Sequence, residues 1–176
     1  KLSKRDMGAN LDDYAAMGYS AEAVAEYVLT LLNSNYEEWR AANAALPYTD
    51  NAIMNEIEAC GVSGLAPRDG EGKLITENIR ATMETLMSYG VGQRVIVHCP
   101  EAGFCLSAEW DFTVVPSLKL PAGYIKGTVG AGDAFCAGAL LGIYQGKTDR
   151  EILEFASGAA VAALSTALSD FLRGAL

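Results

Sequence analysis

The chain has 176 residues, enough for one domain with a substantial core. Hydrophobic residues make up 51% of the chain and charged residues 20%, a composition that indicates a globular protein and argues against a disordered one. The net charge of −9 argues against nucleic acid or an anionic membrane as the main partner, so we expect a small-molecule partner.

The cysteines and the apolar runs indicate the cellular location of the protein. No apolar run reaches transmembrane length, and the basic start from Lys1 to Arg5 is not followed by the apolar segment of a signal peptide. No C-x-x-C pair is present, and the single histidine, His98, does not complete a zinc site. We therefore expect a cytoplasmic protein without membrane contact. Three of the four cysteines lie in apolar settings typical of buried free thiols; the four are Cys60, Cys99, Cys105 and Cys136.

The first third of the chain predicts helices followed by one strand. Residues 1–19 show no clear periodicity, whereas apolar spacing predicts a helix over residues 20–33 and a second helix over 36–45. The short apolar run over 51–54 is typical of a buried strand, and a short helical segment follows over 55–61.

The rest of the chain alternates helices with short β-branched runs. The expected elements are a helix over 76–89, strands over 94–99, 104–108 and 112–115, a helix from 130 to about 145 and a last helix through 168. Thr148 or Asp149 is expected to cap the last helix, while Asp111 and Asp149 are expected to face solvent. The alternation predicts α/β layers with a mostly parallel sheet. Ligands bind beyond the carboxyl ends of such strands, so Asn55 and Gly130 could share one edge.

A glycine-rich turn over residues 130–132 carries the strongest functional signal. The apolar run after it predicts a buried helix, so the backbone amides of Gly130, Ala131 and Gly132 would lie at a helix N-terminus, which favours phosphate. Asp133 would repel a phosphate there unless it takes part in chemistry, and its natural role is to accept a proton from an attacking hydroxyl. The plain alternative is a tight turn that only lets a strand and a helix pack closely.

These residues resemble the C-terminal motif of the ribokinase (phosphofructokinase-B type) family of carbohydrate kinases, Asp-Thr-x-Gly-Ala-Gly-Asp-x-Phe-x-x-Gly. The resemblance implies a three-layer α/β/α fold and ATP-dependent phosphoryl transfer to a sugar-like hydroxyl. It makes Asp133 the catalytic base and the amides of residues 130–132 an anion hole. The chain keeps the motif at Thr128, Gly130, Ala131, Gly132, Asp133, Phe135 and Gly138.

Two departures and one missing feature concern the nucleotide site. The family often has Thr-x-Gly-x-x-Gly after a central strand, whereas this chain has His98 and Pro100 at the first two of those positions and keeps Gly103. Gly103 is therefore a candidate nucleotide-binding residue. His98 could donate to a phosphate, but a lone histidine at a strand end is more typical of a structural residue. Gly127 replaces the first Asp of the motif, so potassium activation through that carboxylate should be weak or absent. The family's late glycine-containing nucleotide loop is not recognisable.

A second family pattern, Asn-x-x-Glu, matches Asn55 and Glu58. By resemblance these residues position Mg²⁺ and the phosphates, often through water. Magnesium suits the pattern because it prefers oxygen ligands and keeps several of its waters. The alternative is a glutamate that only suits the start of a helix through the helix dipole.

The resemblance covers about residues 50–168 and leaves residues 1–45 poorly placed. Family members are longer, and their N-terminal half supplies most sugar contacts. We therefore expect residues 1–176 to form one α/β nucleotide-binding region that is an incomplete version of the fold. Its uncovered apolar surfaces would favour association, a homodimer included.

Three functions stay open at this point. The leading one is an ATP- and Mg²⁺-dependent kinase of a sugar or sugar-like hydroxyl. The second is a vitamin-type kinase acting on pyridoxal or hydroxymethylpyrimidine, because the same fold serves both. The third is a catalytically silent nucleotide-binding or regulatory subunit. No P-loop or dinucleotide-binding motif is present, so those nucleotide folds are excluded.

Overall fold

The structure is a computed structural model, and it describes residues 18, 20, 24 and 44–165. The chain divides into two compact units, Lys1–Ala44 and Ala45–Leu176. Apart from residues 20, 24, 44 and 45, the helices expected over 20–33 and 36–45 lie outside the described residues, so they stay predictions. All elements described below belong to the second unit.

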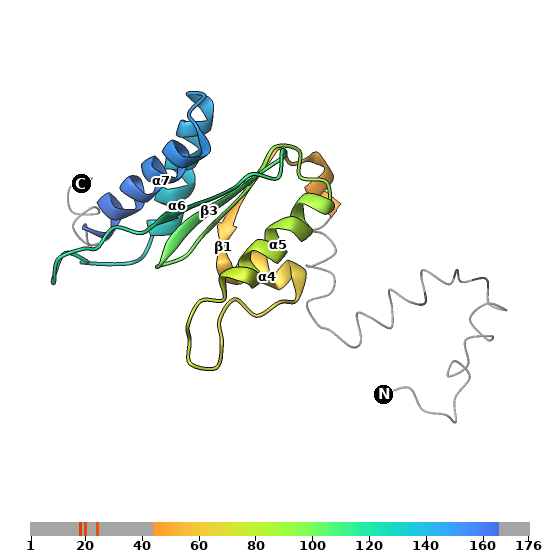
Figure 1. Cartoon of the computed structure of the whole chain (residues 1–176), viewed down its shortest axis with the longest axis horizontal. Helices are drawn as coiled ribbons and strands as arrows, with labels where there is room; N and C mark the ends of the chain where they lie inside the picture. The colour runs from red at the N-terminus through yellow and green to blue at the C-terminus, as the bar shows by residue number, and fades with distance from the viewer. Residues whose placement is uncertain (1–17, 19, 21–23, 25–43, 166–176) are drawn as a thin grey trace. The chain divides into compact units, whose positions relative to one another are not determined.

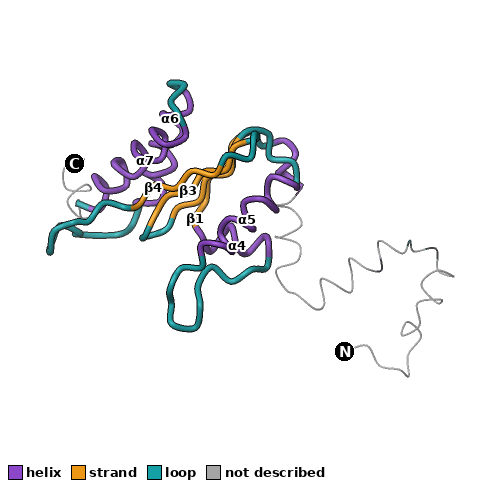
Figure 2. Tube along the Cα trace, in the orientation of Figure 1, coloured by secondary structure: helices purple, strands orange, loops and turns teal. Residues whose placement is uncertain are grey.

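The helices and strands of the second unit lie close to the positions that the sequence predicts (Figure 2), but β2, β3 and β4 follow one another without a helix between them. The helix α7 begins at the expected cap, and residues 166–168 of its predicted end lie outside the described residues. None of the described helices has the length and hydropathy needed to cross a membrane. The elements are a 3-10 helix at Leu46–Tyr48, β1 Asn51–Asn55, α4 Glu56–Ser63, α5 Thr76–Ser88, β2 Arg94–His98, β3 Ala102–Ser107, β4 Phe112–Pro116, α6 Ala131–Tyr144 and α7 Asp149–Leu164.

The four described strands form one mixed sheet in the order β1-β2-β3-β4. β1 pairs with β2 in parallel, with Asn55 opposite His98, whereas β2–β3 and β3–β4 are antiparallel. The expectation of a mostly parallel sheet is therefore wrong for these strands. The reason is the length of the connections, because residues 99–101 and 108–111 allow only hairpins, and a parallel crossover needs about a dozen residues or more.

Helices cover both faces of the sheet, which gives the expected three layers (Figure 1). Alternate residues of a strand point to opposite faces. In β2, Val95 and Val97 pack toward α4 and α5, whereas Ile96 packs toward α6 and α7. Because both faces are buried, the strands read as continuous apolar runs.

The cysteines follow the expectation of free thiols. Cys60, Cys99 and Cys105 are buried and Cys136 is half-buried, and none forms a disulfide. Burial raises the pKa of the Cys99 thiol to about 11 and that of the Cys105 thiol to about 12, so both stay protonated at neutral pH.

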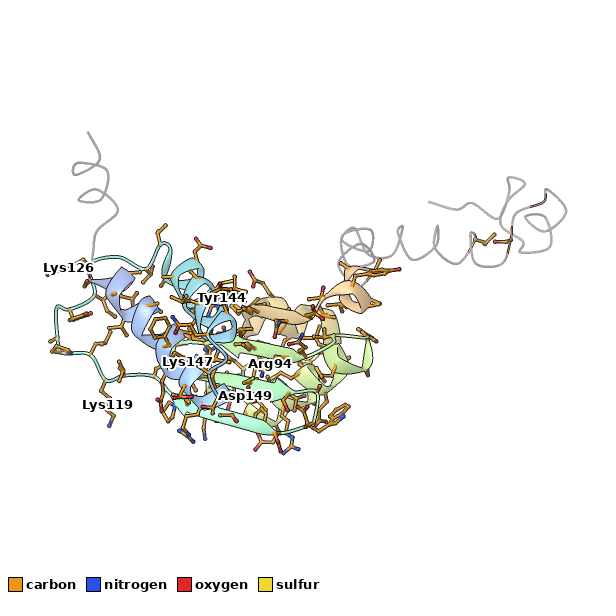
Figure 3. The ribbon with its side chains drawn as sticks, turned by 90° about the horizontal axis from the view of Figure 1, so that it is seen from above. Arg94, Lys119, Lys126, Tyr144, Lys147 and Asp149 are labelled. Carbon is orange, nitrogen blue, oxygen red and sulfur yellow. The ribbon has the colours of Figure 1, made fainter. Side chains whose placement is uncertain are left out.

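The N-terminus of α7 is fixed in two ways. Thr148 caps it in a capping box, in which the Thr148 side chain accepts from the amide of Glu151 and the Glu151 carboxylate accepts from the amide of Thr148. Asp149 forms an ion pair with Arg94 of β2 at 2.8 Å (Figure 3). The expectation that Asp149 faces solvent is therefore wrong, because its side chain is only 18% exposed. Asp111 is exposed, as expected.

The two helices α6 and α7 approach closely at glycines of α6. A Cβ atom on Gly138 would lie 2.9 Å from Cα of Ala156 and 3.0 Å from Cβ of Ala159, too close for any other residue without movement of the backbone. A Cβ atom on Gly142 would lie 3.3 Å from Cα of Ile152. This contact holds α6, and with it the glycine-rich turn, in a fixed position against the sheet.

We predict that Gly138→Ala lowers the free energy of unfolding by about 1–3 kcal/mol, because the added methyl group forces α6 away from α7. Gly158→Ala is the matched control. Gly158 lies in α7 with open space around its Cα, so alanine should be neutral or stabilise the helix by up to about 1 kcal/mol. Urea denaturation of both variants measures the difference. Equal stability of the two variants would contradict the close packing.

Candidate functional site: a cavity at the carboxyl ends of β1 and β2

A cavity of about 620 Å³ lies at the edge of the sheet where β1 and β2 end. Its volume falls within the range typical of small-molecule sites. One end of the cavity is polar and is formed by Asn55, His98, Thr128, Ala131 and Gly132. The strands and the glycine-rich turn therefore meet at one edge, as the sequence predicts from the position of Asn55 and the turn.

The start of α6 leaves backbone amides free at the polar end. Its N-cap is Gly130, in the left-handed region at φ +83°, so no side chain caps the helix. The amide of Ala131 makes only a 3.4 Å hydrogen bond to the carbonyl of Thr128, and within the described part of the chain the amides of Gly132 and Asp133 have no partner. Free amides and the positive end of the helix dipole make this turn an anion site.

Another part of the cavity lining is apolar. The segment between β4 and α6 forms one wall, and it is tied down by two backbone hydrogen bonds, from Ser117 to Glu101 at 2.9 Å and from Lys126 to Leu164 at 2.8 Å. Leu118 is 59% exposed, so this wall is open to solvent. The apolar lining consists of Leu118, Leu120, Ile125, Ala160, Val161 and Leu164.

Asn55 and Glu58 form a capping box at the start of α4. Oδ1 of Asn55 accepts from the amides of Ile57 at 3.0 Å and Glu58 at 2.8 Å, and Oε2 of Glu58 accepts from the amide of Asn55 at 3.0 Å. Asn55 lines the cavity, whereas Glu58 is exposed outside it. Among the described residues, no group of three or more His, Cys, Asp or Glu side chains could hold a metal ion. The pair fits a water-mediated contact with Mg²⁺, because both side chains already accept hydrogen bonds from backbone amides.

An ion-pair network that the sequence does not predict includes Glu56, one of the residues that line the cavity. Arg68, in the loop between α4 and α5, donates to the carboxylates of Glu56 at 2.8 Å and Glu101 at 2.6 Å and 3.0 Å. The guanidinium holds the pKa of Glu101 down at about 2, so this carboxylate stays charged and paired. This network joins residues that are far apart in the sequence, because Arg68 lies 33 residues from Glu101. No short sequence pattern therefore predicts it.

The remaining predicted residues take different places. Asp133 lies in the first turn of α6 and is exposed; its side chain makes no hydrogen bond or ion pair within residues 44–165, and it does not line the cavity. Gly103 does line it, but a Cβ there would also lie 3.3 Å from Leu153 and 3.4 Å from Phe135, so packing alone favours glycine. Gly130 shapes the turn without lining the cavity.

A stretch of the chain is similar to glutamate–tRNA ligases. It is 54% identical over 61 residues to the glutamate–tRNA ligase of Acetivibrio thermocellus and 40% identical over 65 residues to that of Clostridium perfringens. These matches cover 31% and 36% of this chain. The chain spans about a tenth of the length of these curated relatives, at 11% and 12%.

The fold is similar to that of ribokinase-like enzymes. Arabidopsis thaliana ribokinase, solved with ribose and ATP, gives a TM-score of 0.58 at 24% identity and covers 70% of this chain and 37% of the ribokinase. Anopheles gambiae adenosine kinase gives 0.60 at 22% identity, over 92% of this chain and 46% of that kinase. The chain thus spans less than half of either enzyme. The model of the pfkB family carbohydrate kinases matches residues 6–171, and the chain therefore belongs to that family.

Proposed function

We propose that this chain forms the nucleotide side of a kinase that transfers a phosphoryl group from ATP to a hydroxyl of a sugar or sugar-like molecule. One observation carries the proposal: the uncapped start of α6 opens onto a cavity whose lining is apolar in another part. An anion site next to an apolar surface is complementary to a nucleoside triphosphate, which has charged phosphates and a flat base. Family membership agrees with this chemistry and leaves the acceptor open.

The phosphates and the base of the nucleotide would bind to different parts of the cavity. The free amides of Gly132 and Asp133 would donate to the terminal phosphates, where charge develops during transfer. The apolar lining between Leu118 and Leu164 would hold the flat base. Arg68 pairs with Glu56, which lines the cavity, and so reduces the repulsion between this carboxylate and the phosphates. Residues Thr128 and Gly103 on the wall would contact the donor.

Asp133 is the proposed general base. Its exposed carboxylate begins α6 beside the anion turn, and it does not line the nucleotide cavity, so it can face an acceptor hydroxyl from the other side of the transferring group. The acceptor class includes sugars and nucleosides, and vitamin alcohols are the alternative. A subunit that binds nucleotide without turnover is the remaining alternative, and the prediction for Asp133 below separates it from an enzyme.

The proposed role of Asn55 and Glu58 is to orient Mg²⁺ through its water shell. When bound, the ion would neutralise charge on the phosphates. Asn55 lines the polar end of the cavity, and Glu58 keeps one carboxylate oxygen outside the capping box.

We infer no ligase function from the likeness to glutamate–tRNA ligases. It covers about a tenth of those enzymes, at 11% of the first, and the net charge of −9 disfavours contact with the phosphate backbone of tRNA.

We predict that Gly132→Asp raises the dissociation constant for ATP about tenfold or more, because it places a carboxylate where the phosphates bind. A Cβ at this position would meet His98 at 3.4 Å, an ordinary contact, so the backbone should keep its shape. Gly158→Asp, on an exposed and open part of α7, adds the same charge elsewhere and should change ATP affinity less than about twofold. Isothermal titration calorimetry measures both. Equal weakening by the two variants would place the phosphates elsewhere.

We predict that Asp133→Asn leaves ATP binding as tight as before or tighter, since a negative charge beside the phosphates is removed. Phosphoryl transfer should fall by about 10² to 10⁴-fold if Asp133 is the base. The assay measures ADP formed by the intact protein, with the acceptor-binding half that family members carry, in the presence of ATP, Mg²⁺ and a panel of sugars, nucleosides and vitamin alcohols. Transfer by the variant at close to the original rate would contradict the assignment. ATP binding without turnover on any acceptor would favour the silent subunit.

We predict that Glu58→Gln increases the Mg²⁺ concentration needed for half-maximal ATP binding several-fold. Glutamine keeps an oxygen that accepts the hydrogen bond of the capping box and removes only the charge, so α4 should stay intact. Glu154→Gln removes another exposed carboxylate, from α7, and is the control. If Glu58→Gln does not change the Mg²⁺ concentration needed for half-maximal ATP binding, Glu58 only caps the helix α4.

A further inference from the structure

One arginine outside the cavity binds two segments that form the cavity wall. Arg68 belongs to the loop that joins α4 to α5 (Figure 1), and it is not among the residues that line the cavity. Its Nη2 donates to the carboxylate of Glu56, the first residue of α4, at 2.8 Å. Its two terminal nitrogens also form a two-bond fork with the carboxylate of Glu101, in the turn between β2 and β3, at 2.6 Å and 3.0 Å. Arg68 therefore joins the start of α4 to this turn.

The sheet alone does not fix these two segments relative to each other. β1 and β2 are paired up to Asn55 and His98, and beyond these residues one strand continues into α4 and the other into the turn over 99–101. Within the described residues, no other hydrogen bond or ion pair joins the first turn of α4 to this turn. Both segments line the cavity, at Glu56, Ile57, Cys99 and Pro100.

Glu101 also contacts a third segment of the cavity wall. Its carbonyl oxygen accepts from the amide of Ser117 at 2.9 Å, where the segment between β4 and α6 begins. Ser117 and Leu118 both line the cavity, and Leu118 belongs to its apolar part. The turn that Arg68 holds is therefore joined to the surface proposed to hold the base.

The loop between α4 and α5 holds Arg68 itself in place. Arg68 and Leu74 form an antiparallel bridge across the loop, and the amide of Ile75 donates to the carbonyl of Pro67 at 2.9 Å. Nη1 of Arg68 also donates to the carbonyl of Gly72 at 3.1 Å. A guanidinium that is fixed by its own loop can hold two carboxylates in a defined geometry.

We propose that Arg68 is a positioning residue for the phosphoryl donor. It holds the start of α4 and the turn over 99–101 at a fixed separation, and it thereby fixes the wall against which the nucleotide binds. The inference rests on the proposed function and adds to it a residue that acts on the nucleotide site from outside. Charge alone does not give this role, because a lysine keeps the charge and lacks the planar fork that binds both carboxylates.

Two substitutions of Arg68 separate positioning from charge. Arg68→Lys keeps the positive charge without the fork, and Arg68→Met removes both. We expect both variants of the full chain to bind ATP and adenosine about fivefold or more weakly in isothermal titration calorimetry, because neither variant holds the two wall segments together. Adenosine has no phosphate, so its loss of affinity reports the position of the wall and not its charge. Arg150→Met, which removes the exposed ion pair with Glu154 on α7, is the control and should change either affinity less than about twofold.

The two ligands and the two variants give distinct outcomes. If Arg68→Lys binds ATP as tightly as the original chain does, the charge of Arg68 is sufficient and the inference is wrong. If adenosine binds both variants as tightly as the original chain, the wall has not moved and the inference is wrong as well, although the proposed function stands. If the original chain binds neither ligand, the proposed function fails and the inference fails with it.

Amide hydrogen exchange of the full chain distinguishes a local movement of the wall from a general loss of stability. We expect Arg68→Met to speed exchange at the amide of Ser117, whose acceptor is the carbonyl of Glu101, by about tenfold or more. The amides of Val95 and Val97, in the buried strand β2, should stay as protected as in the original chain. Equal acceleration at all three amides would mean that the variant unfolds more readily as a whole, and it would overturn the positioning role.

Discussion

The free backbone amides at the start of α6 are the feature on which the proposed site depends. Two other described helices, α4 and α7, close their first turns with a side chain, from Asn55 and Thr148. In α6 the corresponding position is Gly130, which has no side chain, so the first turn stays open toward the cavity. Leaving amides unpaired is unfavourable, and a bound anion relieves that cost.

The packing of the second unit keeps this turn in place. Gly138 lets α6 lie against α7, and the pair Arg94–Asp149 ties α7 to β2. Arg68 pairs with Glu56, the one glutamate among the described residues that line the cavity. The packing of α6 thus gives the proposed anion site a fixed geometry.

The sequence predicts the local features well because they have local causes. The apolar strands, the cap at Thr148 and the position of the glycine-rich turn all follow from short patterns, and the structure confirms them. Three features depend on contacts across the chain and were not predicted: the antiparallel pairing of β3, the ion pair of Asp149 and the network around Arg68. The similarity to glutamate–tRNA ligases, which covers 31% of the chain in the first match, was not predicted either. The roles of Asp133, Asn55, Glu58 and the turn stay predictions.

The anion site at the start of α6 can be tested by a crystal structure of the chain with a non-hydrolysable ATP analogue. We expect the terminal phosphates to lie within hydrogen-bond distance of the amides of Gly132 and Asp133. We also expect the base to lie between Leu118 and Val161, in the apolar part of the cavity. If the phosphates lie away from the first turn of α6, or the base lies outside the cavity, the start of α6 is not the nucleotide site.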